Sequence, residues 1–182
     1  MSGYDFRDII TFWFEETGPG DWWKGDPHFD HLIKNRFLGV HAAACRCELF
    51  RWREKPLGRL AEILLLDQFS RHIHRGTPAS FAFDPMALAL AQEAIRMGVQ
   101  EHFSPPQKAF LYMPFMHSES SLIHEIAGKL FVEPGLERQL QFELRHKAII
   151  DRFGRYPHRN QTLGRESTPE EREFLTQPGS SF

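Results

Sequence analysis

Residues 56–74 read PLGRLAEILLLDQFSRHIH, and this stretch decides the fold class. Its centre, Ile63–Leu66, is apolar on every side, which is typical of a helix buried against several neighbours. Four apolar residues could equally form a buried strand, but the long flanks and the absence of nearby turn residues favour a helix. We therefore expect one long helix over residues 56–74 that is buried on most sides.

Proline and glycine divide the rest of the chain into segments of helical length, and almost none of them alternates with the period of a strand. Most of these segments begin at a proline that follows an acidic or hydroxyl residue, a common helix start. The predicted helices cover residues 4–16, 29–52, 56–74, 85–97 and 134–153, with others starting at 105 and 169. The sequence thus predicts an all-α chain of about eight helices, whose short joints suit antiparallel hairpins, stacked or bundled.

The chain of 182 residues has a globular composition, with 41% hydrophobic and 25% charged residues, which argues against disorder. Its size predicts one domain over residues 1–182, with 176–182 as a frayed tail. No apolar run approaches the ~18 residues of a membrane span, and the start lacks the pattern of a secretory signal. Cys45 and Cys47 stand two apart in an expected helix, so their side chains diverge and a disulfide is not expected. Together these features suggest a protein of the reducing cytoplasm.

Three polar clusters interrupt this pattern, and the first follows the apolar centre of residues 56–74. Asp67, Arg71 and Arg75 are spaced four apart, so they line one face of the expected helix. A carboxylate beside the most apolar turn of the chain is costly to bury unless a cation compensates it. The cluster is either an intrahelical ion pair that holds a helix end, or a site in which Asp67 orients Arg71 and Arg75 toward a ligand.

The second cluster is MPFMHSE, residues 113–119, which puts a titratable histidine beside apolar residues. His117 is a candidate general base because the unperturbed pKa of histidine lies near neutral, and Glu119 is a candidate to orient it. A metal site built from His117, Glu119 and His146 is conceivable, but no established metal-binding spacing is present, and no metal is expected. The simpler interpretation is a core histidine whose hydrogen bonds are satisfied.

The third cluster is RFGRYPHRNQTLGR, residues 152–165. Residues 145–165 hold six lysines or arginines against one acid, a local charge of +5 in a chain whose net charge is −2. Arginine in a loop with glycine, proline and aromatic residues is suited to planar, bidentate binding of carboxylate or phosphate. Alternatively, these arginines pair with acids elsewhere and pin the C-terminal loop to the body of the protein.

The three clusters together resemble an uncharacterised, mainly bacterial family known as domain of unknown function 924. The residues that carry the resemblance are Trp13-Phe14, LLDQFSR at 65–71 with Arg75-Gly76, PFMHSE at 114–119, RFGRYPHRN at 152–160, Leu163-Gly164-Arg165 and STPEE at 167–171. Ser70, His72 and His124 depart from the family pattern, which has proline, asparagine and glutamine there. The resemblance implies a tetratricopeptide-like all-α fold, although no 34-residue repeat is demonstrable in the sequence itself. It brings no established activity.

From the residues we expect a pocket for a small anionic ligand, in a protein that is an enzyme of unknown reaction or a binding protein. The candidate catalytic residues are His117 and Glu119, and the candidate ligand-binding residues are Asp67, Gln68, Arg71, Arg75, His146, Arg152, Arg155, Arg159 and Asn160. The sequence does not identify a cofactor. The alternative is a helical-repeat adaptor that binds a peptide or protein partner, with the arginines purely structural. The overall charge argues against a nucleic-acid surface.

Overall fold

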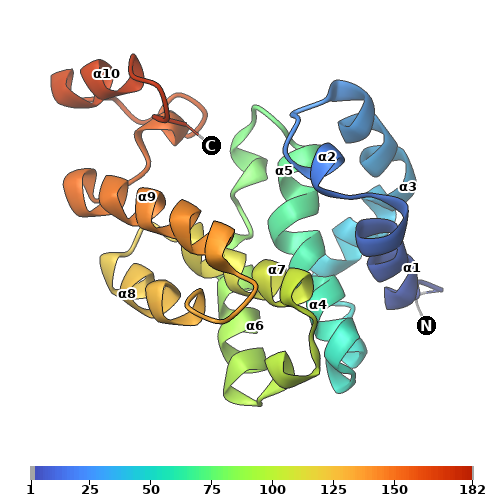
Figure 1. Ribbon diagram of the computed structural model, residues 1–182. Coiled ribbons are helices and arrows are strands. Elements are labelled where there is room, and N and C mark those ends of the chain that lie inside the picture. Colours follow the sequence, from blue (N-terminus) through green and yellow to red (C-terminus); the bar gives the residue numbers. More distant parts are fainter. Residues whose placement is uncertain (1–2, 182) are drawn as a thin grey trace.

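The computed structural model describes residues 3–181, and within that range every regular element is helical (Figure 1), which confirms the all-α prediction. The helices are α1 (Phe6–Thr11), α2 (Pro19–Trp22), α3 (Pro27–Cys45), α4 (Pro56–Leu64), α5 (Ser70–Ile73), α6 (Asp84–Arg96), α7 (Pro105–Met116), α8 (Ser121–Leu130), α9 (Glu137–Phe153) and α10 (Pro169–Leu175). Among these residues, none of the helices combines the length and apolar character that a bilayer crossing requires.

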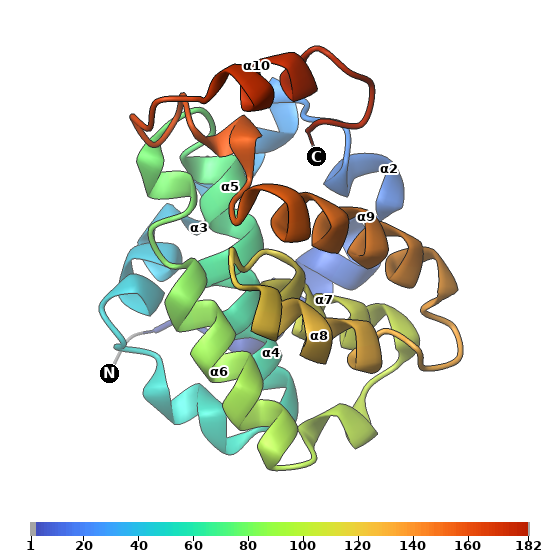
Figure 2. The same ribbon diagram turned by 90° about the vertical axis from the view of Figure 1, so that its left-hand side faces the viewer.

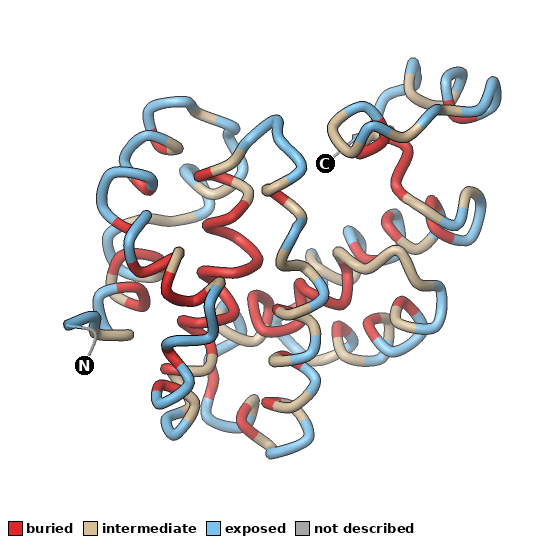
Figure 3. The backbone as a smooth tube through the Cα atoms, turned by 180° about the vertical axis from the view of Figure 1, so that it is seen from behind, coloured by how far each residue is buried: buried red, intermediate tan, exposed pale blue. Residues whose placement is uncertain are grey.

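The predicted long helix over residues 56–74 is confirmed, with one irregularity in its middle. Helix α4 runs directly into α5 through a π-helical turn at Leu65–Phe69, and every residue from 61 to 70 is buried. Figure 3 shows this run as a continuous buried segment. Helices α1, α3, α6 and α7 pack around it. Since burial of one leucine or isoleucine contributes about 1.5–3 kcal/mol, this single helix anchors the fold.

Several predicted boundaries differ from the structure, each for a local reason. Helix α3 ends at Cys45 rather than near residue 52, and Cys47 follows with φ of +58°, so only the first of the two free thiols lies in a helix. Helix α9 begins at Glu137 rather than at residue 134, because Gly135 forms a turn with φ of +87°. Gly154 ends that helix in the left-handed conformation, as expected.

The second half of the chain adds the elements that matter for the site. Helices α8 and α9 form a hairpin that packs on α7, while α10 and the loop before it lie beyond the C-terminal end of α9 (Figures 1 and 2). A small apolar cluster of Ile149, Ile150 and Tyr156, with Phe153 and Phe174 against it, joins α10 to α9. In the segment predicted to fray, Ser180 is buried and its hydroxyl donates to the carbonyl of Leu175, while Phe182 lies outside the described residues.

Candidate functional site

A cavity of about 1060 Å³ opens between α2, α5, α7 and α9. None of the described residues that line it is an aspartate or a glutamate. Its basic lining residues are Lys24, Arg71, Arg75, Arg138, Arg145 and Arg159, and its histidines are His72, His117, His146 and His158. Aromatic and thioether side chains supply much of the remaining wall. Such a lining favours ligands that combine negative charge with an apolar part.

The buried acid of the first cluster stands directly behind this lining. Asp67 lies in the π-helical turn, is 1% exposed, and places Oδ1 2.7 Å from Nδ1 of His117. Its other oxygen accepts from the side-chain amide of Gln68, and Nη1 of Arg71 lies 3.2 Å from Oδ1. Burial raises the pKa of Asp67, but the charge of Arg71 and the contact with His117 outweigh burial and bring the net pKa below its usual range. The carboxylate therefore stays ionised.

This arrangement fixes the protonation of His117. Burial and the nearby Arg71 lower its pKa, although Asp67 acts in the opposite direction, so the imidazole is neutral at neutral pH. An ionised carboxylate only accepts, so the single proton sits on Nδ1 and is donated to Asp67. Nε2 is then left with a lone pair. His117 lines the cavity with a side chain that is 15% exposed, which gives the cavity an unprotonated, accessible base.

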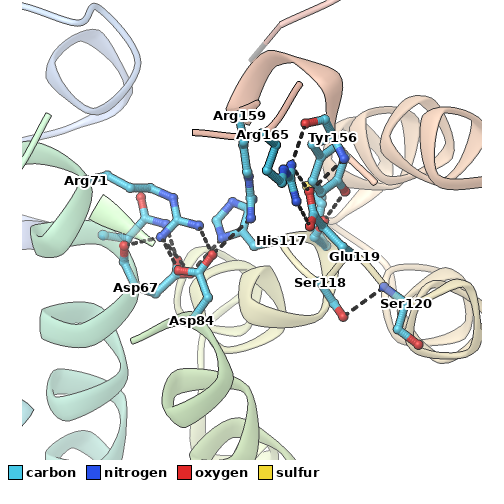
Figure 4. Close-up of polar contacts among 12 residues, drawn as sticks. Asp67, Arg71, Asp84, His117, Ser118, Glu119, Ser120, Tyr156, Arg159 and Arg165 are labelled. Carbon is cyan, nitrogen blue, oxygen red and sulfur yellow. Dashed lines mark hydrogen bonds and ion pairs between the residues drawn. The ribbon is translucent and has the colours of Figure 1, made fainter. Parts of the chain in front are cut away.

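Two arginines share one acid beside this base (Figure 4). Arg71 donates to both carboxylate oxygens of Asp84 at 3.0 Å, and Nη1 of Arg159 donates to Asp84 Oδ2 at 3.2 Å. The guanidinium of Arg159 lies over the rings of Phe81 and Tyr156, 4.6 and 4.7 Å from their centres. Its side chain is 8% exposed, and its Nε has no hydrogen-bond partner among the described residues. Arg71 also lies 3.2 Å from Asp67, so the two arginines face two carboxylates, Asp67 and Asp84, and the unused donor of the pair is Nε of Arg159.

The structure brings most of the predicted ligand-binding residues to this cavity. Gln68, Arg71, Arg75, His146 and Arg159 line it together with His117, and Asp67 supports them from behind. Arg75 is also held by Asp30, which accepts from His72 as well. Burial lowers the pKa of His146 to about 3, and Nδ1 of that histidine donates to the carbonyl of Phe142. His146 therefore contributes a neutral ring to the wall.

The remaining predicted residues lie in a second network that pins the C-terminal loop. Glu119 makes a two-pronged pair with Arg165 at 2.6 and 2.9 Å and accepts from the backbone N–H of Tyr156, so Asp67, not Glu119, is the carboxylate on His117. Arg155 makes a similar pair with Glu171 at 2.7 and 2.8 Å, which holds the pKa of that carboxyl at about 2. Asn160 bridges the two pairs.

Arg152 also lies outside the cavity lining, where it pairs with Glu170 at 3.0 Å on the exposed surface. Three of the arginines in residues 152–165 are therefore paired internally, and Arg159 alone reaches the cavity. Both interpretations that the sequence left open for the third cluster therefore apply: one arginine lines the cavity, and the other three hold the C-terminal loop.

Sequence reasoning missed one stripe of the site, on α9. Arg138, Phe142 and Arg145 are spaced four and three apart and so share a helix face, and all three line the cavity. The two guanidinium groups lie on the ring of Phe142, each 5.8 Å from its centre. The spacing was visible in the sequence, but basic and aromatic residues on one face of a polar helix are usually solvent-exposed. Only the structure shows that this face borders the cavity. Asp84 was likewise recognised only as a helix start.

A buried acid–base pair lies deeper in the same region. His124 and Glu143 are both fully buried, with Nδ1 2.7 Å from Oε1. Nε2 of His124 faces the carbonyl of Ser118 at 2.9 Å, so it must carry a proton. Burial raises the pKa of Glu143, although the hydrogen bond with His124 acts in the opposite direction.

No three histidine, cysteine, aspartate or glutamate side chains in residues 3–181 come together as metal ligands would. The three residues from which a metal site was conceivable are engaged separately. His117 is held by Asp67, Glu119 by Arg165, and His146 by the carbonyl of Phe142.

Comparison with known proteins supports the family resemblance. Residues 9–179 match the family described as bacterial protein of unknown function, DUF924. No curated protein matches the chain. A solved structure of a protein of unknown function from Agrobacterium tumefaciens is 42% identical, with a TM-score of 0.89, over 93% of this chain and 96% of its own. The chain belongs to DUF924, a bacterial family of unknown function.

Proposed function

We propose that this protein binds a small organic anion in the cavity and that His117 serves there as a general base. The observation that supports this most strongly is the Asp67–His117 pair, which leaves Nε2 unprotonated in a cavity that has basic residues but no acid in its described lining. Titratable groups whose pKa values are shifted by burial and by a specific charged partner are concentrated at functional sites.

Arg71 and Arg159 would bind the anion and fix its position. A carboxylate or phosphate beside Arg71 and Arg159 would receive charge-assisted hydrogen bonds from guanidinium groups whose positions Asp84 and the two aromatic rings already fix. Nε2 of His117 would then accept a proton from the ligand or from a water beside it. The resulting imidazolium is stabilised by the ionised Asp67 behind it. The proposed reaction is therefore the abstraction of a proton. As for its location, the two free cysteine thiols fit a protein of the reducing cytoplasm.

Binding is tested by titration calorimetry with small phosphates and carboxylates on Arg159→Gln, with Arg152→Gln as the matched control on the surface. Binding should weaken at least about tenfold in Arg159→Gln and stay unchanged in the control, since a charge-assisted hydrogen bond contributes about 1.5–3 kcal/mol. Arg71→Lys, which keeps the charge but loses the planar fork, should weaken binding as well. Equal affinities in all three variants would refute the site.

A second proposal, a helical adaptor with a tetratricopeptide-like stack, has one observation in its favour. Helix α8 exposes Leu122 and Ile126, one turn apart, at 65% and 38%. A partner would cover these two side chains and leave the cavity dispensable. If so, Leu122→Glu would abolish partner binding while Arg159→Gln would not, which is opposite to the result expected for anion binding.

A further inference from the structure

We infer that the anion of this cavity carries a flat aromatic body, which lies along one face of α7 with its charged group at the Arg71–Arg159 pair. The inference rests on the proposed function and names the class of ligand: an aryl carboxylate or aryl phosphate. Three features of the cavity lead to it, namely its size, the order of the side chains on its floor and the aromatic groups at its outer wall.

The size of the cavity favours an organic anion over an inorganic one as the whole ligand. A volume of about 1060 Å³ is at the upper end of what drug-sized organic ligands occupy. Arg71, Arg159 and His117 occupy only one part of the lining, and most of the other lining residues are uncharged. A bare phosphate would leave that apolar wall in contact with water, at a cost that an apolar body would remove.

The floor of the cavity has a polar end and an apolar end. Phe110 and Met113 on α7 and His117 at its C-terminal cap follow one another at spacings of three and four, so they share a face, and all three line the cavity. Seven residues at 1.5 Å each separate His117 from Phe110 by about 10 Å along the helix axis. This is the length of a molecule with one aromatic ring and a charged group on a short arm. The thioether of Met113 lies between the two ends, where sulfur favours aromatic neighbours.

The apolar end is built from stacked rings with one face left open. Trp22 packs edge-on against Phe110 with centroids 4.8 Å apart, and Trp23 lies parallel to Phe110 at 6.0 Å. Phe110 is 2% exposed, whereas Trp23 is 52% exposed and lines the cavity. An indole held parallel to a buried ring and still half exposed offers its outer side to another flat group. Aromatic stacking of this kind adds to the gain from area alone.

The α9 stripe supports a flat ligand rather than a flexible chain. Phe142 is 37% exposed, and the guanidinium groups of Arg138 and Arg145 lie on its ring. Among residues 3–181, neither arginine pairs with a carboxylate. Guanidinium planes stack on aromatic faces as well as binding anions, whereas an alkyl chain has no quadrupole for them to contact. This wall therefore favours a flat aromatic group over an alkyl chain, both by its shape and by its electrostatics.

The test compares methyl, cyclohexyl and phenyl phosphate by titration calorimetry on the wild-type protein. Phenyl phosphate should bind about tenfold tighter than methyl phosphate and also tighter than cyclohexyl phosphate. Trp23→Ala and Phe142→Ala should each reduce the affinity for phenyl phosphate, and with it the preference for phenyl over methyl phosphate, several-fold. Phe50→Ala, which removes an exposed ring outside the cavity lining, is the matched control and should change neither.

The outcomes separate this inference from the proposed function. If methyl and phenyl phosphate bind equally well through Arg159, the anion site stands and the aromatic body is refuted. If cyclohexyl phosphate matches phenyl phosphate, the body is apolar without being flat, and the inference again fails. If none of the three binds, and the matching carboxylates acetate, cyclohexanecarboxylate and benzoate do not bind either, the proposed function fails and the inference fails with it.

Discussion

Replacing Asp67 with asparagine changes a single group and separates what the buried carboxylate does for stability from what it does for His117. Asp67 is 1% exposed and contacts His117, Arg71 and Gln68. The asparagine keeps the shape and one carbonyl oxygen but loses the charge that compensates Arg71. Its amide also brings two donors to a place where the side chain of Gln68 already donates.

The size of the effect follows from what remains around Arg71. Removing one partner of a buried ion pair costs about 3–5 kcal/mol when the other charge is left alone. Arg71 is not left alone, because Asp84 still accepts from it twice at 3.0 Å. We therefore expect a loss of about 2 kcal/mol, below that range. For a chain of this length, the loss lowers Tm by about 4–8 °C.

The effect on His117 is expected to be larger than the effect on stability. An asparagine amide that donates to Nδ1 moves the ring proton to Nε2, which removes the lone pair from the cavity. The ¹⁵N shifts of the ring distinguish the two tautomers directly, and thermal unfolding measures the stability. Asp151→Asn, at an exposed pair with Lys147, is the control and should change Tm by less than about 2 °C. A Tm within 1 °C of wild type together with a proton retained on Nδ1 would refute the charged pair.

Two further predictions concern the loop and the buried histidines. Arg155→Ala should lower the free energy of unfolding by about 1–3 kcal/mol, which is less than the loss of a whole buried pair because Thr168 and Asn160 still donate to Glu171. Anion binding should stay unchanged. Urea unfolding measures the stability and titration calorimetry the binding, and weakened binding at full stability would show that Arg155 belongs to the site. Burial lowers the pKa of His41 and His158 to about 4 and of His146 to about 3, so below about pH 6.5 the unfolded chain binds protons that the folded chain does not. Stability should therefore fall between pH 6.5 and pH 4 by about 1 kcal/mol per pH unit for each histidine, and unfolding free energies that stay level from pH 7 to pH 5 would contradict this.

The fold class was accessible from the sequence because its signals are local. The apolar run at 63–66 and the prolines that open the helices depend only on neighbouring residues, and the structure agrees with both. The two π-helical turns, at Phe12–Glu16 and Leu65–Phe69, were not predicted, since residue type does not show where a helix takes an extra residue into one turn. Tertiary packing decides that.

The site was only partly accessible for the same reason. The unusual position of Asp67 in an apolar helix marked it correctly, and the structure gives it His117 as a partner across 50 residues of chain. Which arginine meets which acid could not be read from composition. Arg155 and Arg159 are four residues apart, yet one pairs with Glu171 of α10 and the other with Asp84 beside the cavity. Only the path of the loop through space separates them.

The π-helical turn at Leu65–Phe69 also determines how the site can change. Each residue of an α-helix advances the side-chain direction by about 100°. If the same residues wound as a regular α-helix, the extra residue would no longer be absorbed in the turn, and every later side chain of α5 would rotate by about that angle. Arg71 would leave Asp84 and the cavity, although no residue of the site had been substituted. Changes that favour regular α-helical winding here, even if they increased stability, would therefore disrupt the binding geometry, because that geometry depends on the backbone of this turn as well as on the side chains.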